Sequence, residues 1–185
     1  MTGALEDLAE HNAHVLADLA GLVDQLSKPA YTAASDPLYG SSIGQQVRHV
    51  IEHGEAAIAA AAGEVDYHSR TRDPDTERDP ATASHRLTRL MRDLRELGKD
   101  GVADGAVQVR HAVDTEKGTE ETAFPSSIGR ELMFLQSHTI HHMAVIGIMA
   151  HLHGVEVPHG FGVAPSTRRH WAGQQAQNSA TAESA

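Results

Sequence analysis

The chain of 185 residues contains no cysteine, which excludes several kinds of site at once. Disulfide-stapled folds, thiolate-ligated zinc, iron–sulfur clusters and cysteine nucleophiles all require that residue. Aromatic residues make up only 4% of the chain. The longest unbroken apolar run, 56–62, is far shorter than the roughly 20 residues that cross a membrane. Lys and Arg number 15 against 25 Asp and Glu, and the resulting formal charge of −10 disfavours binding to nucleic acid.

The length is that of one domain, which we place at residues 1–170. Residues 174–185 are small and polar, and we expect a disordered tail over residues 171–185. The N-terminal segment is acidic where a secretory signal would be basic and then apolar. We therefore expect a cytoplasmic protein that has no membrane segment.

Apolar residues recur at spacings of three, four and seven in four stretches, which predicts four helices over 4–26, 42–63, 80–98 and 126–154. Ser42, with Gln45 three residues later, fits a capping box at the start of the second helix. A polar, proline- and arginine-rich linker follows that helix. The fold class predicted is all-α, a four-helix bundle.

A short β-hairpin is the exception to this helical pattern, and we place it between the third and fourth helices. Val107, Val109, His111 and Val113 alternate with polar or small residues, which predicts a strand. A turn at Lys117-Gly118 would lead into its partner strand.

The chain contains 14 histidines, and the fourth predicted helix carries the most informative group of them. His138 and His142 lie one turn apart inside its apolar stripe, whereas His141 lies at the edge and His151 on the polar side. Such a pair can direct two imidazole nitrogens at one divalent metal. Two buried histidines that are hydrogen-bonded within the core are the alternative, because buried polar groups need partners.

The second predicted helix offers a similar pair, His49 and His53, at the border of its apolar stripe. The helical wheel places His53 slightly nearer the core and Glu52 further out. Facing helices of a bundle can converge their ligands in the core. Two histidines from the fourth helix and one from the second would give three protein ligands and leave positions open for water or substrate.

Two motifs resemble the DinB-like family of four-helix-bundle proteins. The first is Ser-Ile-Gly-Gln-Gln-Val-Arg-His at 42–49, and the second is His-Thr-Ile-His-His at 138–142. The resemblance extends from residue 42 to about residue 167. The segments 65–74 and 161–167 are similar to one branch of that family.

The resemblance implies a bundle that binds a divalent metal, either zinc, nickel or iron, and often forms a homodimer. Carried over by position, it implies the ligands His49, His138 and His142. It therefore favours His49 over His53, against the preference of the helical wheel. Relatives include transferases that use low-molecular-weight thiols such as bacillithiol or mycothiol, and a thiol-dependent isomerase.

The resemblance, together with the histidine pairs, implies a metal-dependent thiol S-transferase that acts on a small electrophile. Its metal would lower the pKa of a bound thiol. His53, Glu52 and His141 are the candidates for a base or an orienting group. Arg70 and Arg72 in the linker are candidates for holding a substrate carboxylate. The alternatives are a hydrolase or isomerase that activates water, and a metal-binding or stress-associated protein without catalysis.

Overall fold

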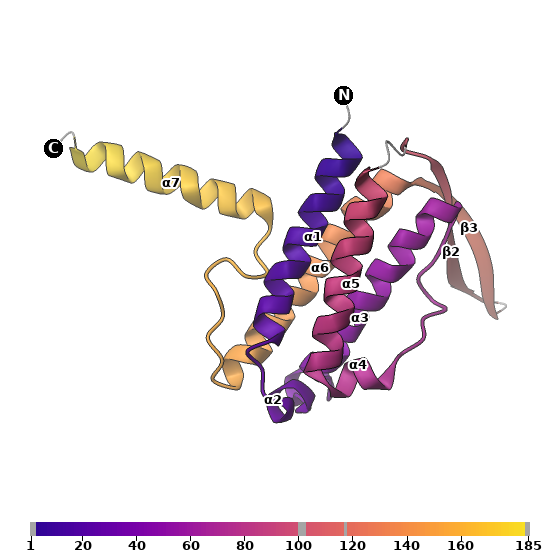
Figure 1. The fold of residues 1–185 in the computed structure, drawn as a ribbon, viewed down its shortest axis with the longest axis horizontal. Helices are drawn as coiled ribbons and strands as arrows, with labels where there is room; N and C mark the ends of the chain where they lie inside the picture. Colours follow the sequence, from indigo (N-terminus) through magenta and orange to yellow (C-terminus); the bar gives the residue numbers. More distant parts are fainter. Residues whose placement is uncertain (1–2, 100–102, 117, 184–185) are drawn as a thin grey trace.

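The computed structural model describes residues 3–99, 103–116 and 118–183. Four long helices lie side by side and form a bundle (Figure 1). They are α1 (Ala4–Val23), α3 (Ile43–Ile58), α5 (Pro80–Lys99) and α6 (Ile128–Leu152). The predicted four-helix bundle is confirmed.

Local capping explains where the helices that carry the site begin and end. The side chain of Ser42 accepts the N–H of Gln45, whose own side chain accepts the N–H of Ser42, so the predicted capping box is formed. The hydroxyl of Ser127 caps α6 in a similar way. A 3-10 turn, η2 (Ala59–Ala62), follows α3 and ends at Gly63, whose φ of 89° suits glycine.

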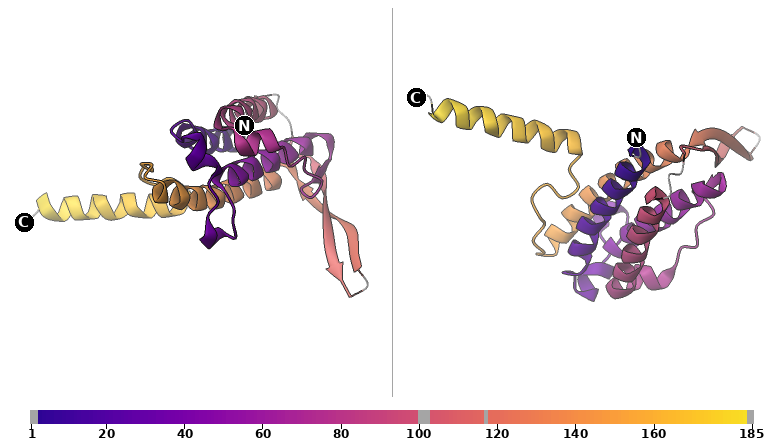
Figure 2. Two further views of the ribbon diagram at one scale, coloured as in Figure 1. Left: turned by 90° about the horizontal axis from the view of Figure 1, so that it is seen from below. Right: turned by 45° about the horizontal axis from the view of Figure 1, so that its top comes forward.

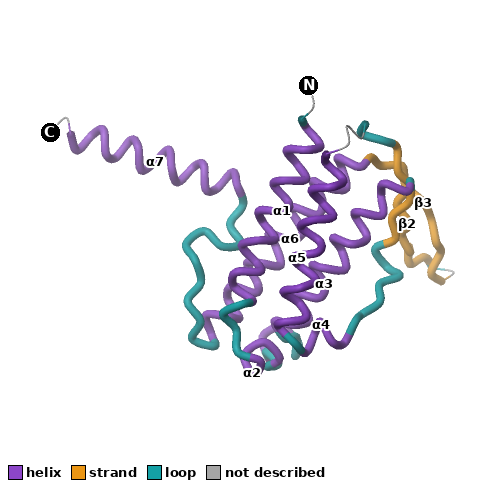
Figure 3. Tube along the Cα trace, viewed as in Figure 1, coloured by secondary structure: helices purple, strands orange, loops and turns teal. Residues whose placement is uncertain are grey.

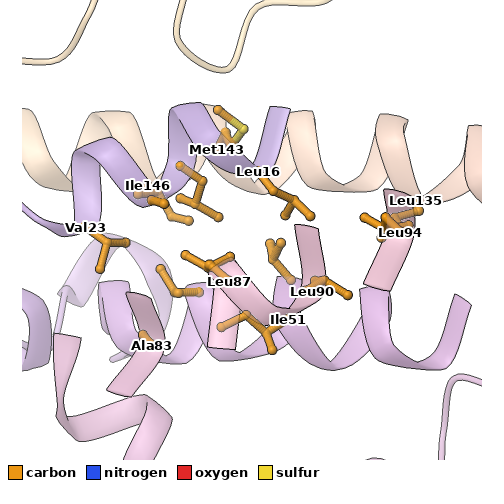
Figure 4. Packing of buried hydrophobic residues seen from close by; sticks show 14 of the residues in the cluster. Leu16, Val23, Ile51, Ala83, Leu87, Leu90, Leu94, Leu135, Met143 and Ile146 are labelled. Carbon is orange, nitrogen blue, oxygen red and sulfur yellow. The ribbon is translucent and has the colours of Figure 1, made fainter. Parts of the chain in front are cut away.

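The core lies along the centre of the bundle and is almost entirely aliphatic (Figure 4). Leu16 of α1, Ile51 of α3, Leu87 of α5 and Met143 of α6 are each at most 1% exposed. Full burial of such a side chain stabilises the folded state by about 1.5–3 kcal/mol. Packing of this kind fixes the neighbouring helices α3 and α6 against each other, and these two helices carry the candidate ligands.

The predicted hairpin is present and is longer than expected. Strands β2 (Ala106–Thr115) and β3 (Gly118–Ser127) pair antiparallel, and the hairpin extends well beyond the bundle (Figure 2). Lys117 of the predicted turn lies outside the described residues. A third strand, β1 (Glu64–Asp66), pairs parallel to β2 and was not predicted, because three residues are too few to show a periodicity.

The linker after α3 differs from the expected polar loop. It contains helix α4 (Pro74–Arg78), which packs against α3 and α5. Thr76 is fully buried, and its carbonyl accepts the hydroxyl of Tyr31 from the short helix α2 (Lys28–Thr32). Asp73 caps α4. The segment therefore folds through caps and tertiary hydrogen bonds rather than through an apolar stripe, which is why its composition did not reveal it.

The tail also differs from the expected disorder. Helix α7 (Pro165–Glu183) projects away from the bundle and includes most of residues 171–185 (Figures 1 and 3). The side chains of residues 168–175 are exposed. The helix has no apolar face that would mark it in the sequence, so its formation there could not be predicted from periodicity. Among the described residues, no helix is long and apolar enough to cross a membrane.

Candidate metal centre

Four histidine rings gather where α3 and α6 face each other. His49 and His53 come from α3, and His138 and His142 come from α6. The ring centroids of His49 lie 4.1 Å from His53, 5.0 Å from His138 and 4.4 Å from His142. Each pair is spaced by four residues, so one turn of helix brings its two rings to the same side. The structure thus unites both predicted pairs in one histidine cluster.

Within the cluster, one nitrogen from each of His49, His53 and His138 lies within 4.8 Å of the other two. The Nε2 atoms of His49 and His138 are only 2.9 Å apart. His53 is thus a full member of the cluster and is only 7% exposed, as the helical wheel had suggested. His142 is the fourth member, with its ring centroid 4.5 Å from that of His138. The ligand set His49, His138 and His142 remains a prediction, with His53 equally close.

Two of the rings are oriented by hydrogen bonds to oxygen. The Nδ1 of His53 lies 3.0 Å from the carbonyl of His49, and the Nδ1 of His142 lies 2.7 Å from the Oε1 of Gln46. Since both partners are acceptors, each Nδ1 must carry the hydrogen and each Nε2 keeps its lone pair. Histidine ligands of metals usually have this second hydrogen bond. The donor set therefore fits a divalent metal that accepts imidazole nitrogen.

Burial keeps the cluster neutral. Loss of solvent, together with the neighbouring imidazoles and Arg70, lowers the pKa of His49 to about 2, of His142 to about 3 and of His53 to about 4. The pKa of His138 is lowered by the same causes. Four imidazoles that are neutral at physiological pH can bind a metal with no net release of protons.

Arg70 brings a positive charge into contact with the cluster. Its Nη1 donates a hydrogen bond to the Nδ1 of His49 and lies 3.5 Å from the Nδ1 of His53. The same Nη1 lies 4.0 Å from a carboxylate oxygen of Glu52. The sequence had singled out Arg70 and Arg72 together, but the structure brings only Arg70 to the histidines, and the side chain of Arg72 is exposed.

Glu52 is buried and supports the segment that carries Arg70. One carboxylate oxygen accepts the N–H of Asp73, and the other lies 4.0 Å from Arg48 and from Arg70. Within the described part of the chain, no hydrogen bond joins Glu52 to a histidine of the cluster. Glu52 was predicted to be a base or an orienting group, and its contacts are those of a group that positions the segment of Arg70. The ring of His141 contacts that of His142 at 5.2 Å, but its side chain is exposed, so it lies at the edge of the cluster.

Two aromatic side chains pack against rings of the cluster, and sequence reasoning did not identify either as part of the site. Tyr67, just after β1, stacks on His53 with ring centroids 5.3 Å apart and an interplanar angle of 14°. Phe134 of α6 stacks on His138 at 5.4 Å and contacts Tyr67 at the same distance. Phe134 lies four residues before His138, and that spacing was the available signal.

The fold and this site define a four-helix bundle with a histidine cluster between two of its helices. The chain belongs to the DinB superfamily, whose sequence profile matches residues 11–146. That match confirms the resemblance inferred from the two histidine motifs.

One curated relative is similar over part of its length. The chain is 32% identical over 106 residues to "FK506-binding protein 5" of Rhizopus delemar (strain RA 99-880). The aligned region covers 57% of this chain and 27% of that protein, so the chain spans about a quarter of the length of this relative. The comparison with solved structures gives no significant match.

Proposed function

We propose that the chain binds one divalent metal at the histidine cluster and uses it to transfer a small thiol to an electrophile. The observation that carries the proposal is the convergence of four neutral imidazoles from α3 and α6, three of them with nitrogens within 4.8 Å of one another. His49, His138 and His142 would hold the metal, and His53 would either complete the ligand set or bind a group beside it. When bound, the metal supplies a Lewis acid that lowers the pKa of a thiol.

Arg70 is suited to hold an anionic group of the substrate. In the structure, the Nδ1 of His49 accepts a hydrogen bond from Arg70, so the His49 hydrogen is on Nε2. If Nε2 of His49 were a ligand, its Nδ1 would carry the hydrogen and would no longer accept from Arg70. The guanidinium can then turn toward a carboxylate, which it binds through parallel hydrogen bonds. Glu52 keeps the segment of Arg70 in place during this change.

The first test is the metal content of protein purified without a tag. Elemental analysis should find about one zinc, nickel or iron per chain. Chelation should remove the metal, and one equivalent should restore it. The His138→Ala variant should stay metal-poor, whereas His151→Ala, changed at an exposed histidine near the end of α6, should bind as the wild type does.

The second test separates the thiol reaction from its alternatives. Metal-loaded protein is given a small thiol and 1-chloro-2,4-dinitrobenzene, and conjugate formation is compared with chelated protein and with His138→Ala. Metal-dependent conjugation supports the proposal. Metal-dependent cleavage of esters or amides without a thiol would point to a hydrolase, and full metal content with no turnover of any substrate would point to a non-catalytic protein.

A further inference from the structure

A cavity of about 400 Å³ lies next to the histidine cluster, between the hairpin and the first turns of α6. Tyr67 and Phe134 belong to its lining, and these are the two rings that stack on His53 and His138. The cavity and the histidine cluster therefore share an aromatic wall. Val109 and Phe124 from the hairpin form part of the rest of the lining.

The polar side chains of this lining are already engaged with partners. The lining side chains of Tyr67, Ser126 and Arg130 each donate a hydrogen bond to Glu131, a fully buried carboxylate behind the lining. The remaining polar side chain, His111, has its Nδ1 3.0 Å from the Nε2 of His68. What the cavity offers to a ligand is therefore mainly apolar and aromatic surface.

The ring of Tyr67 is held in place as part of this surface. Its hydroxyl is 2.7 Å from Glu131, and burial together with that carboxylate raises the pKa of Tyr67, so the phenol stays protonated. The guanidinium of Arg130 lies over the ring of Phe134, with 5.4 Å from its carbon to the ring centroid. Rigid rings of this kind bind flat apolar groups well, because little side-chain entropy is lost on binding.

We infer that this cavity binds a flat apolar group, such as an aromatic ring, and that it holds the body of the substrate whose reacting atom is at the histidine cluster. The second part rests on the proposed function. The cavity would therefore select arene-bearing substrates over equally reactive ones without such a group. Three separated segments build it: the end of β1, the hairpin and α6.

The cavity can be tested without any metal. Benzyl alcohol is titrated into chelated protein, and amide chemical shifts are followed by NMR. The shifts should change around Val109, Phe124 and Phe134. Val109→Phe should fill the cavity and abolish these changes, and Phe124→Ala should weaken binding about five- to tenfold. Val113→Phe makes the same substitution as Val109→Phe further along the same strand and outside the lining, so it is the matched control and should bind as the wild type does.

The link to the histidine cluster is tested in cobalt-loaded protein with two thiols. Benzyl mercaptan should bind about tenfold more tightly than 2-mercaptoethanol, as measured by the thiolate-to-cobalt absorption. Val109→Phe should remove this difference and leave the affinity for 2-mercaptoethanol unchanged. Benzyl alcohol binding elsewhere, for example at the groove beside Ile148 and Leu152, or not at all, would overturn the inference. Equal affinity for the two thiols would also overturn it. Absence of the absorption with both thiols would instead count against the proposed function, while the benzyl alcohol titration still decides whether the cavity binds arenes.

Discussion

The metal-free protein should lose stability as the pH falls from about 6.5 to about 4, and His53 should account for a measurable share of the loss. In the unfolded chain a histidine titrates near pH 6.5, whereas burial lowers the pKa of His53 to about 4 in the fold. Between these values the unfolded state takes up a proton that the folded state does not. The free energy of unfolding is therefore unaffected above pH 6.5 and falls on acidification.

The size of the effect follows from the number of histidines that resist protonation. Each such histidine lowers the free energy of unfolding by about 1.4 kcal/mol for each pH unit of acidification. His53 alone should therefore lower it by about 2 kcal/mol between pH 6.0 and pH 4.5. The pKa values of His49 and His142 are lowered still further, but these rings are only half-buried, and we expect solvent to reduce their shares. A small domain has a total stability of about 5–15 kcal/mol, so the loss is easily measured.

The assay is urea denaturation at several pH values between 7.5 and 4.5, with a chelator present throughout. His53→Ala should lower stability at pH 7.5 because it leaves a cavity. Its free energy of unfolding should, however, depend less steeply on pH, by the slope that the uptake of about one proton on unfolding produces. His151→Ala, at an exposed position, should run parallel to the wild type. Carboxylates with lowered pKa values, such as Asp73, add a slope below pH 5 that is common to all three proteins. Parallel curves for His53→Ala and the wild type would refute the reasoning.

Three further predictions concern the ligands, the packing and the tail. His138→Ala should lower the metal affinity at least 100-fold in isothermal titration, because it removes the nitrogen that faces His49; a full complement of metal would contradict this. Gly44→Ala should destabilise the protein by about 2–4 kcal/mol in thermal or urea unfolding, because the added Cβ would clash with the carbonyl oxygen of Glu77. Gly21→Ala is the control: nothing lies within 4 Å of the added Cβ, so this change should stabilise the helix slightly. Deleting residues 171–185 should leave the Tm nearly unchanged, because α7 projects from the bundle, and a fall of many degrees would show that this segment docks.

Much of the fold was predictable because it depends on local chemistry. The capping box of Ser42 and Gln45 and the apolar periodicity marked the helices of the bundle, and alternation marked the hairpin. Helix α4 was not predicted, since the burial of Thr76 depends on a hydrogen bond from Tyr31, 45 residues away. Contacts of that separation leave no periodic trace in the sequence.

The candidate site was predictable in part. All four histidines of the cluster were singled out from their spacing, but the choice between His49 and His53 could not be made from one helix, because both rings turn toward α6. The roles of Glu52 and Arg70 depend on the fold of the linker. The cavity beside the cluster combines residues from β2, β3 and α6, and only the register of the hairpin places Val109 opposite Phe124.

The contact between His49 and His138 would allow a bound metal to stabilise the folded state. These residues are 89 positions apart, and a metal bound by both would act as a cross-link between α3 and α6. A disulfide that closes a loop of this length stabilises the folded state by about 4–5 kcal/mol, mainly by restricting the unfolded chain. The chain has no cysteine and so cannot form such a bond. Its histidine pairs would provide an equivalent link that depends on the supply of metal, and the lifetime of the folded protein would then rise and fall with that supply.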